Sequence, residues 1–188
     1  LVSIIYLSPV ANLFLKFRFL MGAIKCNDTL AVSIHRIRNS DLNEHGTVYG
    51  GRILELIDGQ ASVAAMRVAR TTVATVSMDE IQFLRPFDLQ DSMCMETYVT
   101  GFGKRSIEVF TKVIGEHLMT GERFLGFYCF MTFVILDPEK QTAFNKLIPE
   151  TEEQKTLMAT YSQRVKQRQN QRQKQQEFLP HISISKPW

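Results

Sequence analysis

Several kinds of functional site have no counterpart in this sequence. Its three cysteines, Cys26, Cys94 and Cys129, are far apart and form no Cys-x-x-Cys pair, and its four histidines form no His-Glu-x-x-His motif. These spacings argue against a disulfide framework and a zinc site, and we expect no metal. The low cysteine count favours a reducing compartment, so we expect a cytoplasmic protein.

A long apolar run is also missing. The first fifteen residues are rich in Leu, Ile and Val, but Pro9 and Asn12 interrupt them and Lys16 follows directly. The stretch is too short and too broken for a membrane span, and its positive charges follow the apolar residues, whereas in a signal peptide they precede them. We therefore interpret residues 1–25 as an N-terminal extension that is either not native or poorly ordered, and we expect no membrane partner.

Charge of one sign is not in large excess. The chain is 45% hydrophobic and 22% charged, with a formal net charge of +3, which is typical of a folded globular protein. Basic residues do gather between 164 and 174, where an RNA or an anionic lipid could bind. Because this stretch is rich in glutamine and has no interleaved aromatics, a solvated helix explains it better, and we expect no nucleic-acid partner.

The hydrophobic pattern predicts an α+β domain. Alternating apolar residues predict a strand at 29–38, and a proline-free apolar stretch predicts a helix at 51–70. Four more strands are expected in antiparallel succession, at 72–85, 92–102, 104–115 and 122–136. One long helix against a curved antiparallel sheet of about five strands fits this order. Within the last of these runs, residues 124–136 are apolar on both faces, which indicates burial on both sides.

One residue of the predicted helix conflicts with its neighbours. Asp58 is spaced by three or four residues from apolar or small side chains, so it shares a helix face with them (Leu54, Ala61, Ala65 and Val68). A carboxylate on such a face must be paired, reach a cavity or have a raised pKa. Asp58 is therefore either a candidate base or nucleophile, or a carboxylate satisfied by backbone amides or by an arginine of a partner subunit.

The segment before this helix adds a second candidate site. It runs from Asn43 to the pair Gly50-Gly51, where the helix begins. Free amides at a helix start stabilise developing negative charge, although a glycine pair also serves tight turns and close packing. Asp58 lies about 10 Å along the helix from Gly51, which is far for one copy of the chain, so we expect a site shared between two protomers.

Four motifs in order resemble the acyl-CoA thioesterases of the hotdog fold, of the cytosolic long-chain acyl-CoA hydrolase type known from bacteria. The motifs are Asn43-x-x-Gly-Thr-Val-Tyr-Gly-Gly51, Ile57-Asp58, Val76-Ser-Met-Asp-Glu-Ile-Gln-Phe-Leu-Arg-Pro86 and Gly103-Lys-Arg-Ser-Ile-Glu-Val109. The resemblance covers residues 29–136. It implies a hotdog domain at 26–140, in which the sheet wraps the long helix, followed by a polar helical tail at 141–188.

The resemblance also implies an activity, namely hydrolysis of fatty acyl-CoA to a free fatty acid and CoA. In the family, each site is built across a homodimer. Carried over, Asn43 would orient water or polarise the thioester, Asp58 would be general base or nucleophile, and the Gly51 amide would help to hold the oxyanion. Dimers commonly assemble into hexamers as trimers of dimers. No cofactor is implied, because CoA is part of the substrate.

The same resemblance places the CoA phosphates near one turn, formed by Gly103, Lys104, Arg105 and Ser106. Cationic side chains and exposed amides suit phosphate, but an ordinary charged hairpin has the same composition. Arg85 is a second phosphate candidate, and Gly50 is expected to line the substrate site with Gly51.

Two other functions are compatible with this fold. The first is a non-catalytic acyl-CoA-binding regulator, which would need an output module that the short N-terminal segment does not provide. The second is a hydratase or dehydratase, which usually pairs a histidine with the acid. No histidine shares the helix face of Asp58, so hydrolysis is the preferred interpretation.

Overall fold

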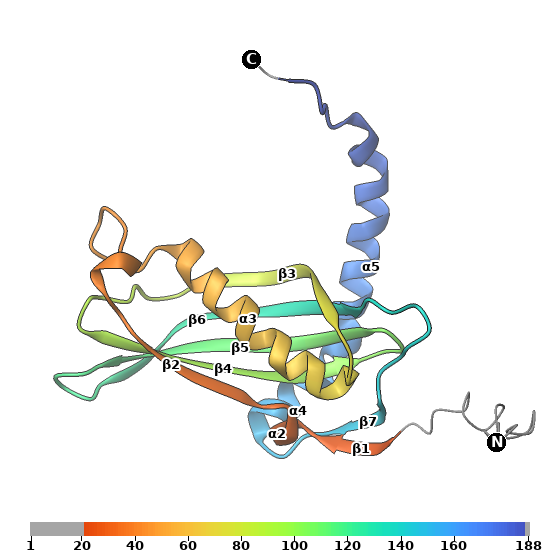
Figure 1. The fold of residues 1–188 in the computed structure, drawn as a ribbon, viewed down its shortest axis with the longest axis horizontal. Coiled ribbons are helices and arrows are strands. Elements are labelled where there is room, and N and C mark those ends of the chain that lie inside the picture. The colour runs from red at the N-terminus through yellow and green to blue at the C-terminus, as the bar shows by residue number, and fades with distance from the viewer. Residues whose placement is uncertain (1–20, 187–188) are drawn as a thin grey trace, which may run out of the picture.

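The structure, a computed structural model, describes residues 21–186 as one layer of sheet between helices (Figure 1). The main sheet has five antiparallel strands in the order β2-β4-β5-β6-β3. Their bounds are Ala31–Arg36 (β2), Val73–Phe83 (β3), Asp91–Phe102 (β4), Ser106–His117 (β5) and Arg123–Ile135 (β6). Both ends of each of the five lie within two residues of the predicted strand, and the expected α+β hotdog class is confirmed.

The central helix α3 spans Gly50–Ala69 and lies along one face of this sheet. Small and branched residues recur every three or four positions and form its fully buried face: Ile53, Ile57, Ala61, Ala64, Ala65, Val68 and Ala69. Alanines let the helix approach the strands closely. The helix ends at Arg70, which adopts the left-handed conformation with φ of 53° and donates its amide to the Met66 carbonyl.

The strand order corrects one expectation. The strands β4, β5 and β6 do pair in antiparallel succession, but β3 pairs with β6 and not with β4. The chain enters α3 from β2 and leaves it into β3, and these two strands form the opposite edges of the sheet. The sheet curves around the helix, so the two connections of the helix reach its two edges while the strands β4, β5 and β6 fill the middle.

A second, small sheet corrects another expectation. Strand β1 (Met21–Lys25) pairs in parallel with β7 (Phe144–Ile148). The short helix α2 (Cys26–Thr29) then leads into β2. Residues 21–25 thus form part of the folded chain and not of an extension, because main-chain pairing with β7 orders them. Residues 1–20, which carry the rest of the predicted extension, lie outside the described residues.

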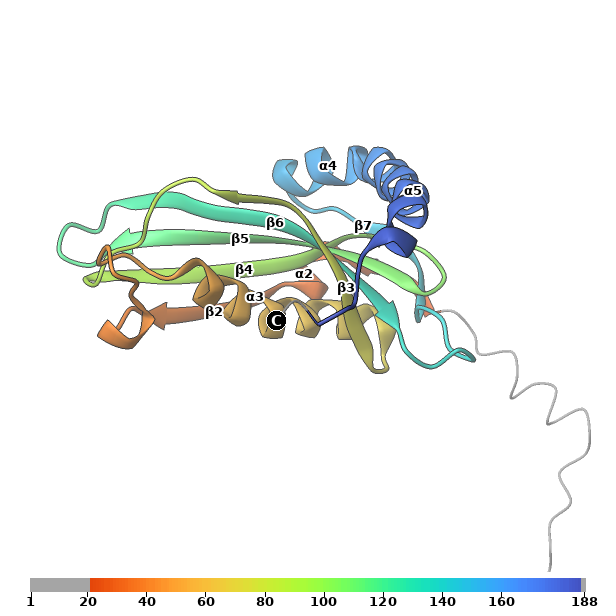
Figure 2. The ribbon, with the colours of Figure 1, turned by 90° about the horizontal axis from the view of Figure 1, so that it is seen from above.

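The C-terminal helices cover part of the opposite face of the sheet (Figure 2). The predicted polar helix is two helices, α4 (Glu152–Ala159) and α5 (Tyr161–Phe178), which meet at Thr160 and are followed by a 3-10 turn at Leu179–His181. Leu157 packs on a row of aromatic side chains, Tyr98, Phe110 and Phe130, from three neighbouring strands. Strand β6 is therefore covered on both faces, as its sequence predicts.

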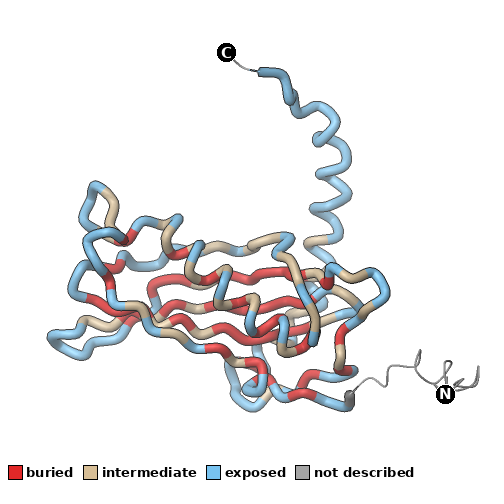
Figure 3. The backbone as a smooth tube through the Cα atoms, in the orientation of Figure 1, coloured by how far each residue is buried: buried red, intermediate tan, exposed pale blue. Residues whose placement is uncertain are grey.

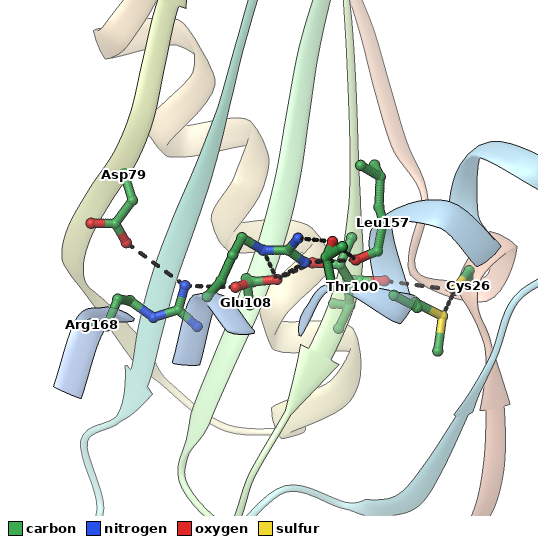
Figure 4. A network of polar contacts seen from close by, with 10 residues as sticks. Cys26, Asp79, Thr100, Glu108, Leu157 and Arg168 are labelled. Atoms are coloured by element: carbon green, nitrogen blue, oxygen red, sulfur yellow. Dashed lines mark hydrogen bonds and ion pairs between the residues drawn. The ribbon is translucent and has the colours of Figure 1, made fainter. Parts of the chain in front are cut away.

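A buried ion cluster fastens α5 to the sheet (Figure 4). Glu108 is 1% exposed and accepts hydrogen bonds from Arg164 and Arg168, and from the hydroxyl of Thr100. The first half of α5 is thus not the solvated helix that we expect from its composition, because two of its arginines are neutralised by the sheet. Its second half does lie exposed, projecting from the domain (Figure 3). Within residues 21–186, no helix is long and apolar enough to span a membrane.

Candidate active site

Asn43 lies in a tight turn between the 3-10 turn at Asn39–Asp41 and helix α3. Its side-chain oxygen accepts the amides of His45 and Thr47, at 2.9 and 3.2 Å. Its side-chain nitrogen donates to the Thr47 hydroxyl at 3.1 Å. An amide nitrogen carries two hydrogens, so Asn43 holds its own turn and keeps one donor for a ligand. The side chain is half-buried.

The glycine pair forms the first turn of α3. An added Cβ at Gly51 would lie 2.4 Å from the Tyr49 ring, and one at Gly50 would lie 3.4 Å from the Phe83 ring. Close packing against Tyr49 is therefore as good a reason for a glycine at position 51 as the approach of a ligand would be. The first amides of a helix have no partner within it, and among the described residues nothing accepts a hydrogen bond from the Gly51 amide. That amide is exposed and free to bind an anion or a carbonyl oxygen.

Asp58 points across to the edge strand β3. Its Oδ1 accepts a hydrogen bond from the Thr75 hydroxyl at 2.7 Å. No described residue donates to Oδ2, which leaves this oxygen available to a water or a substrate. Thr75 is a residue that the sequence interpretation missed, because no motif links positions 58 and 75. The only signal was the need for a partner to Asp58.

The surroundings of Asp58 correct the expectation of a buried carboxylate. Asp58 is half-exposed and lies at the margin of the buried face of α3, next to Ile57, which is fully buried. Successive helix residues are rotated by about 100°, so a residue beside the centre of the buried stripe lies at its rim. The sequence leaves open whether the Asp58 carboxylate is paired, reaches a cavity or has a raised pKa. Within one chain it is paired with the hydroxyl of Thr75.

Asn43 and Asp58 do not meet within one copy of the chain. The turn of Asn43 precedes the first residue of α3, whereas Asp58 lies eight residues after Gly50, roughly 12 Å along the helix axis. No hydrogen bond among the described residues joins the two side chains. Gly51, by contrast, lies at the same end of the helix as Asn43. The candidate residues therefore form two separate groups, which we call candidate half-sites, one with Asn43 and Gly51 and the other with Asp58 and Thr75.

The phosphate candidates lie in two distant places. The turn of Gly103, Lys104, Arg105 and Ser106 joins β4 to β5, and it is closed by a hydrogen bond from the Gly103 amide to the Ser106 carbonyl. Arg85 lies near the other end of the sheet, 4.4 Å above the ring of Phe124. Nine steps of β5 separate Ser106 from the partner of Phe124, roughly 30 Å. One phosphate cannot bind both in the same chain.

The two cations of the turn differ in their freedom. Arg105 folds back and donates from Nη2 to the Ile135 carbonyl at 2.7 Å, and its Nε is buried with no partner in the described part of the chain. Lys104 is exposed, and no described residue pairs with its ammonium group. Lys104 is therefore the cation of this turn that a solvent-borne phosphate can reach.

The histidines are engaged elsewhere. His35 bonds Asp41 and His117 bonds Asp91, while His45 is exposed beside Glu44. Throughout residues 21–186, no group of three His, Cys, Asp or Glu side chains could hold a metal ion. The site residues of the described chain are therefore a carboxylate, an amide, hydroxyls and main-chain N–H groups, which suit acid–base chemistry on a polarised carbonyl.

Comparison with known proteins identifies the family. Residues 45–122 match the family model described as the thioesterase superfamily. A Bacillus subtilis protein, described as the uncharacterized acyl-CoA thioester hydrolase YkhA, is 42% identical over 87% of this chain and 95% of its own. The chain belongs to the thioesterase superfamily. A rat cytosolic acyl coenzyme A thioester hydrolase is 30% identical over 65% of this chain, which spans 33% of that longer protein.

Solved structures of similar fold are acyl-CoA hydrolases. One from Bacillus cereus is 32% identical, with a TM-score of 0.81 over 87% of this chain and all of the other. One from Staphylococcus aureus, in complex with butyryl coenzyme A, coenzyme A and coenzyme A disulfide, is 26% identical, with a TM-score of 0.78 over 85% and 98%. An apo-hexameric acyl-CoA thioesterase is 30% identical, with a TM-score of 0.75 over 80% and 97%.

The Staphylococcus aureus hydrolase has also been solved as three alanine variants, of an asparagine, an aspartate and a threonine. Along that chain the asparagine and the aspartate are 15 positions apart, and the aspartate and the threonine 17. In the present chain Asn43 and Asp58 are 15 positions apart, and Asp58 and Thr75 are 17 apart.

Proposed function

We propose that this protein hydrolyses the thioester of fatty acyl-CoA, releasing a fatty acid and CoA. The observation that carries the proposal is the second half-site, in which Thr75 holds one oxygen of Asp58 and leaves the other free. A carboxylate with one oxygen fixed is oriented for a water molecule or for direct attack. Membership of the thioesterase superfamily and the acyl-CoA hydrolases of similar fold support this activity.

Each residue then has one role. Asp58 is the general base or nucleophile at the thioester carbon. Asn43 uses its remaining amide hydrogen to polarise the carbonyl or to orient the water, and the Gly51 amide stabilises the oxyanion at the helix start. Gly50 lies beside it. The equal spacings of the Asn, Asp and Thr substituted in the Staphylococcus aureus hydrolase support Asn43, Asp58 and Thr75 as one set.

The two half-sites come from different copies of the chain. Within one copy they are separated along α3, so a complete site needs the Asn43 end of one copy against the Asp58 region of another. Large apolar side chains are exposed on α3 and on the edge strand β3: Val63, Met66, Val76 and Phe83. A second copy that covers them would bury this apolar surface and bring the half-sites together. The hexameric acyl-CoA thioesterase of similar fold supports a homo-oligomer, and the arrangement that we propose is a trimer of dimers.

Lys104 is the residue that we assign to the CoA phosphates. Lys104 is exposed and unpaired within the described chain, whereas the guanidinium of Arg105 donates a hydrogen bond to the carbonyl of Ile135. The exposed hydroxyl of Ser106 is a further hydrogen-bond donor at the same turn. Arg85 lies too far away to serve the same phosphate from the same chain, so it would act only from another copy.

The release of free CoA tests the proposal. The purified protein is incubated with acyl-CoAs of increasing chain length, and the liberated thiol is titrated. We expect turnover by the wild type and a loss of about 100- to 10,000-fold in kcat for Asp58→Asn, which keeps the shape but removes the base. A folded wild-type protein that releases no CoA from any acyl-CoA overturns the proposal.

The protein's own cysteine thiols can also react with the reagent that titrates free CoA, and they determine the background signal of this assay. Burial raises the pKa of the Cys26 and Cys129 thiols to about 12, and burial also raises the pKa of Cys94. Thiolates are the reactive form, so these thiols react slowly near neutral pH. Cys94 is the least buried of the three, and a Cys94→Ser protein gives the matched blank.

Hydration of enoyl-CoA is the second candidate on this fold. It usually needs a histidine beside the acid, and in the described chain each of His35 and His117 is bonded to another aspartate. The same proteins assayed with an enoyl-CoA distinguish the two reactions, because hydration consumes the double bond and releases no thiol. Binding of acyl-CoA with neither reaction would favour a regulator.

A further inference from the structure

A buried aspartate lies at the base of the loop that carries Asn43. Asp41 is 3% exposed, and both of its carboxylate oxygens are used. Oδ2 accepts the His35 Nε2 and the Arg38 amide, each at 2.8 Å, and Oδ1 accepts the Arg52 Nε at 3.0 Å. We propose that Asp41 is a positioning residue for the hydrolysis, which fixes Asn43 and the Gly51 amide relative to each other; this rests on the proposed function.

The three partners of the carboxylate come from three different parts of the chain. His35 belongs to β2, Arg38 precedes the 3-10 turn, and Arg52 belongs to the first turn of α3. The main-chain carbonyl of Asp41 also accepts the Tyr49 amide at 2.9 Å, immediately before the helix. Asp41 therefore ties the beginning of the loop to its end and both to the helix start.

The two residues that Asp41 would position, Asn43 and Gly51, lie close in sequence to Asp41 and to its partner Arg52. Asn43 follows Asp41 by two residues, and Gly51 immediately precedes Arg52. The turn of Asn43 itself is closed by its own hydrogen bonds to Thr47, so it moves as a unit on the loop. Displacement of that unit by about 1 Å would misplace Asn43 relative to the Gly51 amide, and such errors cost about 100-fold in rate.

The three hydrogen-bond donors around the side chain of residue 41 require a carboxylate at this position. Burial alone would raise the pKa of Asp41, but the hydrogen bonds from His35, the Arg38 amide and Arg52 together hold it below its ordinary value. All three partners are donors, and Arg52 also bonds the carboxylate of Glu55, at 2.7 Å. An asparagine at 41 would bring an N–H group against these donors and would break at least one of the bonds.

The chain offers a matched control in Asp91. It is 2% exposed, and its carboxylate accepts a histidine, His117, and a turn amide, that of Asp88. Its side chain bonds neither the turn of Asn43 nor α3. The variants Asp41→Asn and Asp91→Asn therefore lose comparable buried interactions, but only the Asp41 carboxylate bonds the start of α3 directly. Asp91 reaches the turn of Asn43 only indirectly, through Asp88, which forms a bridge with Thr47.

The test compares these variants by steady-state kinetics of CoA release and by thermal unfolding. We expect Asp41→Asn to lower kcat by about 10- to 100-fold with a smaller change in KM, and Asp91→Asn to lower the unfolding temperature with kcat nearly unchanged. His35→Gln, which keeps a donor near the position of Nε2, should retain more of kcat than His35→Ala. Equal kcat for Asp41→Asn and wild type overturns the positioning role.

A mixed oligomer separates positioning from a general loss of stability. When chains with Asn43→Ala are combined with chains with Asp58→Ala, the one functional site of each pair uses Asn43 of the second chain. Asp41→Asn added to that second chain should reduce the restored activity, and added to the first chain should not. An equal effect from both chains overturns the proposal. Wild-type protein without CoA release would instead overturn the proposed function, and with it this inference.

Discussion

At the scale of single residues, the hydrolysis that we propose depends on Asp58 and on the Thr75 hydroxyl that it binds. A carboxylate at the rim of a helix can rotate, and the bond to Thr75 fixes one of its oxygens at 2.7 Å. Thr75 comes from β3, so an edge strand of the sheet orients a side chain of the helix. The cost of losing a hydrogen bond to a charged group is about 1.5–3 kcal/mol, which corresponds to roughly 10- to 100-fold in rate if the bond also holds in the transition state.

Replacement of Thr75 by valine tests this bond. Valine keeps the β-branched shape and removes the hydroxyl, so we expect kcat for CoA release to fall roughly 10-fold or more while the strand stays intact. Thr75 is exposed in the single chain, so thermal stability should change little. The measurement is kcat and KM on one acyl-CoA, beside the unfolding temperature.

Thr75→Ser is the control for this variant, because serine retains the hydroxyl. It should keep most of the activity. If valine and serine at this position are equally active, the hydroxyl does not orient Asp58, and the assignment of Thr75 to the site is wrong.

At the scale of elements, helix α5 depends on one buried carboxylate. Glu108 of β5 is bound by Arg164, 7% exposed at its side chain, and by Arg168, which also reaches Asp79 of β3 at 3.8 Å. Removing one partner of a buried ion pair leaves the others uncompensated and typically costs about 3–5 kcal/mol. The cluster therefore decides whether α5 stays on the sheet.

Glu108→Gln should release the first half of α5. The glutamine still accepts a hydrogen bond but no longer neutralises two arginines, so we expect a lower unfolding temperature and faster amide hydrogen exchange along residues 161–168. The second half of α5 is exposed already and should exchange rapidly in both proteins. Unchanged protection of residues 161–168 in the variant would contradict the role of this cluster.

The elements themselves could be predicted from the sequence, because their periodicity is local. The helix predicted at 51–70 is found at Gly50–Ala69, and the strand predicted at 122–136 at Arg123–Ile135. The pairing of β3 with β6 could not be predicted, since alternation along a strand does not name its neighbour. The break at Thr160, and the strand β7 with its partner β1, likewise depend on contacts between distant segments.

The sequence points to single candidate residues of the site but not to the hydrogen bonds that join them to other elements. Asn43, Gly51 and Asp58 stand out by residue type and by the family resemblance. Thr75, and the bonds of Asp41 to His35 and Arg52, join positions from different elements, and nothing in the sequence ties one to another. Arg105 and Lys104 are alike in sequence, and only the fold separates the folded-back side chain from the exposed one.

At the scale of the whole molecule, the chain is one half of each site that we propose. Large apolar residues are exposed on α3 and β3, and the two candidate half-sites lie apart. The second copy that we propose against this side of the domain would account for both. An isologous dimer would form two equivalent sites, each with Asn43 from one chain and Asp58 from the other. Activity and assembly should therefore be lost together.

Complementation between two inactive variants tests this claim most directly. Asn43→Ala and Asp58→Ala chains are either purified separately, unfolded and refolded together, or co-expressed in one cell. The assembled protein is then assayed for CoA release. Random pairing gives half mixed dimers, each with one intact site of two, so about a quarter of the wild-type activity should return. If the mixture stays as inactive as its components although mixed dimers form, Asn43 and Asp58 do not act across a subunit interface, and the central claim is wrong.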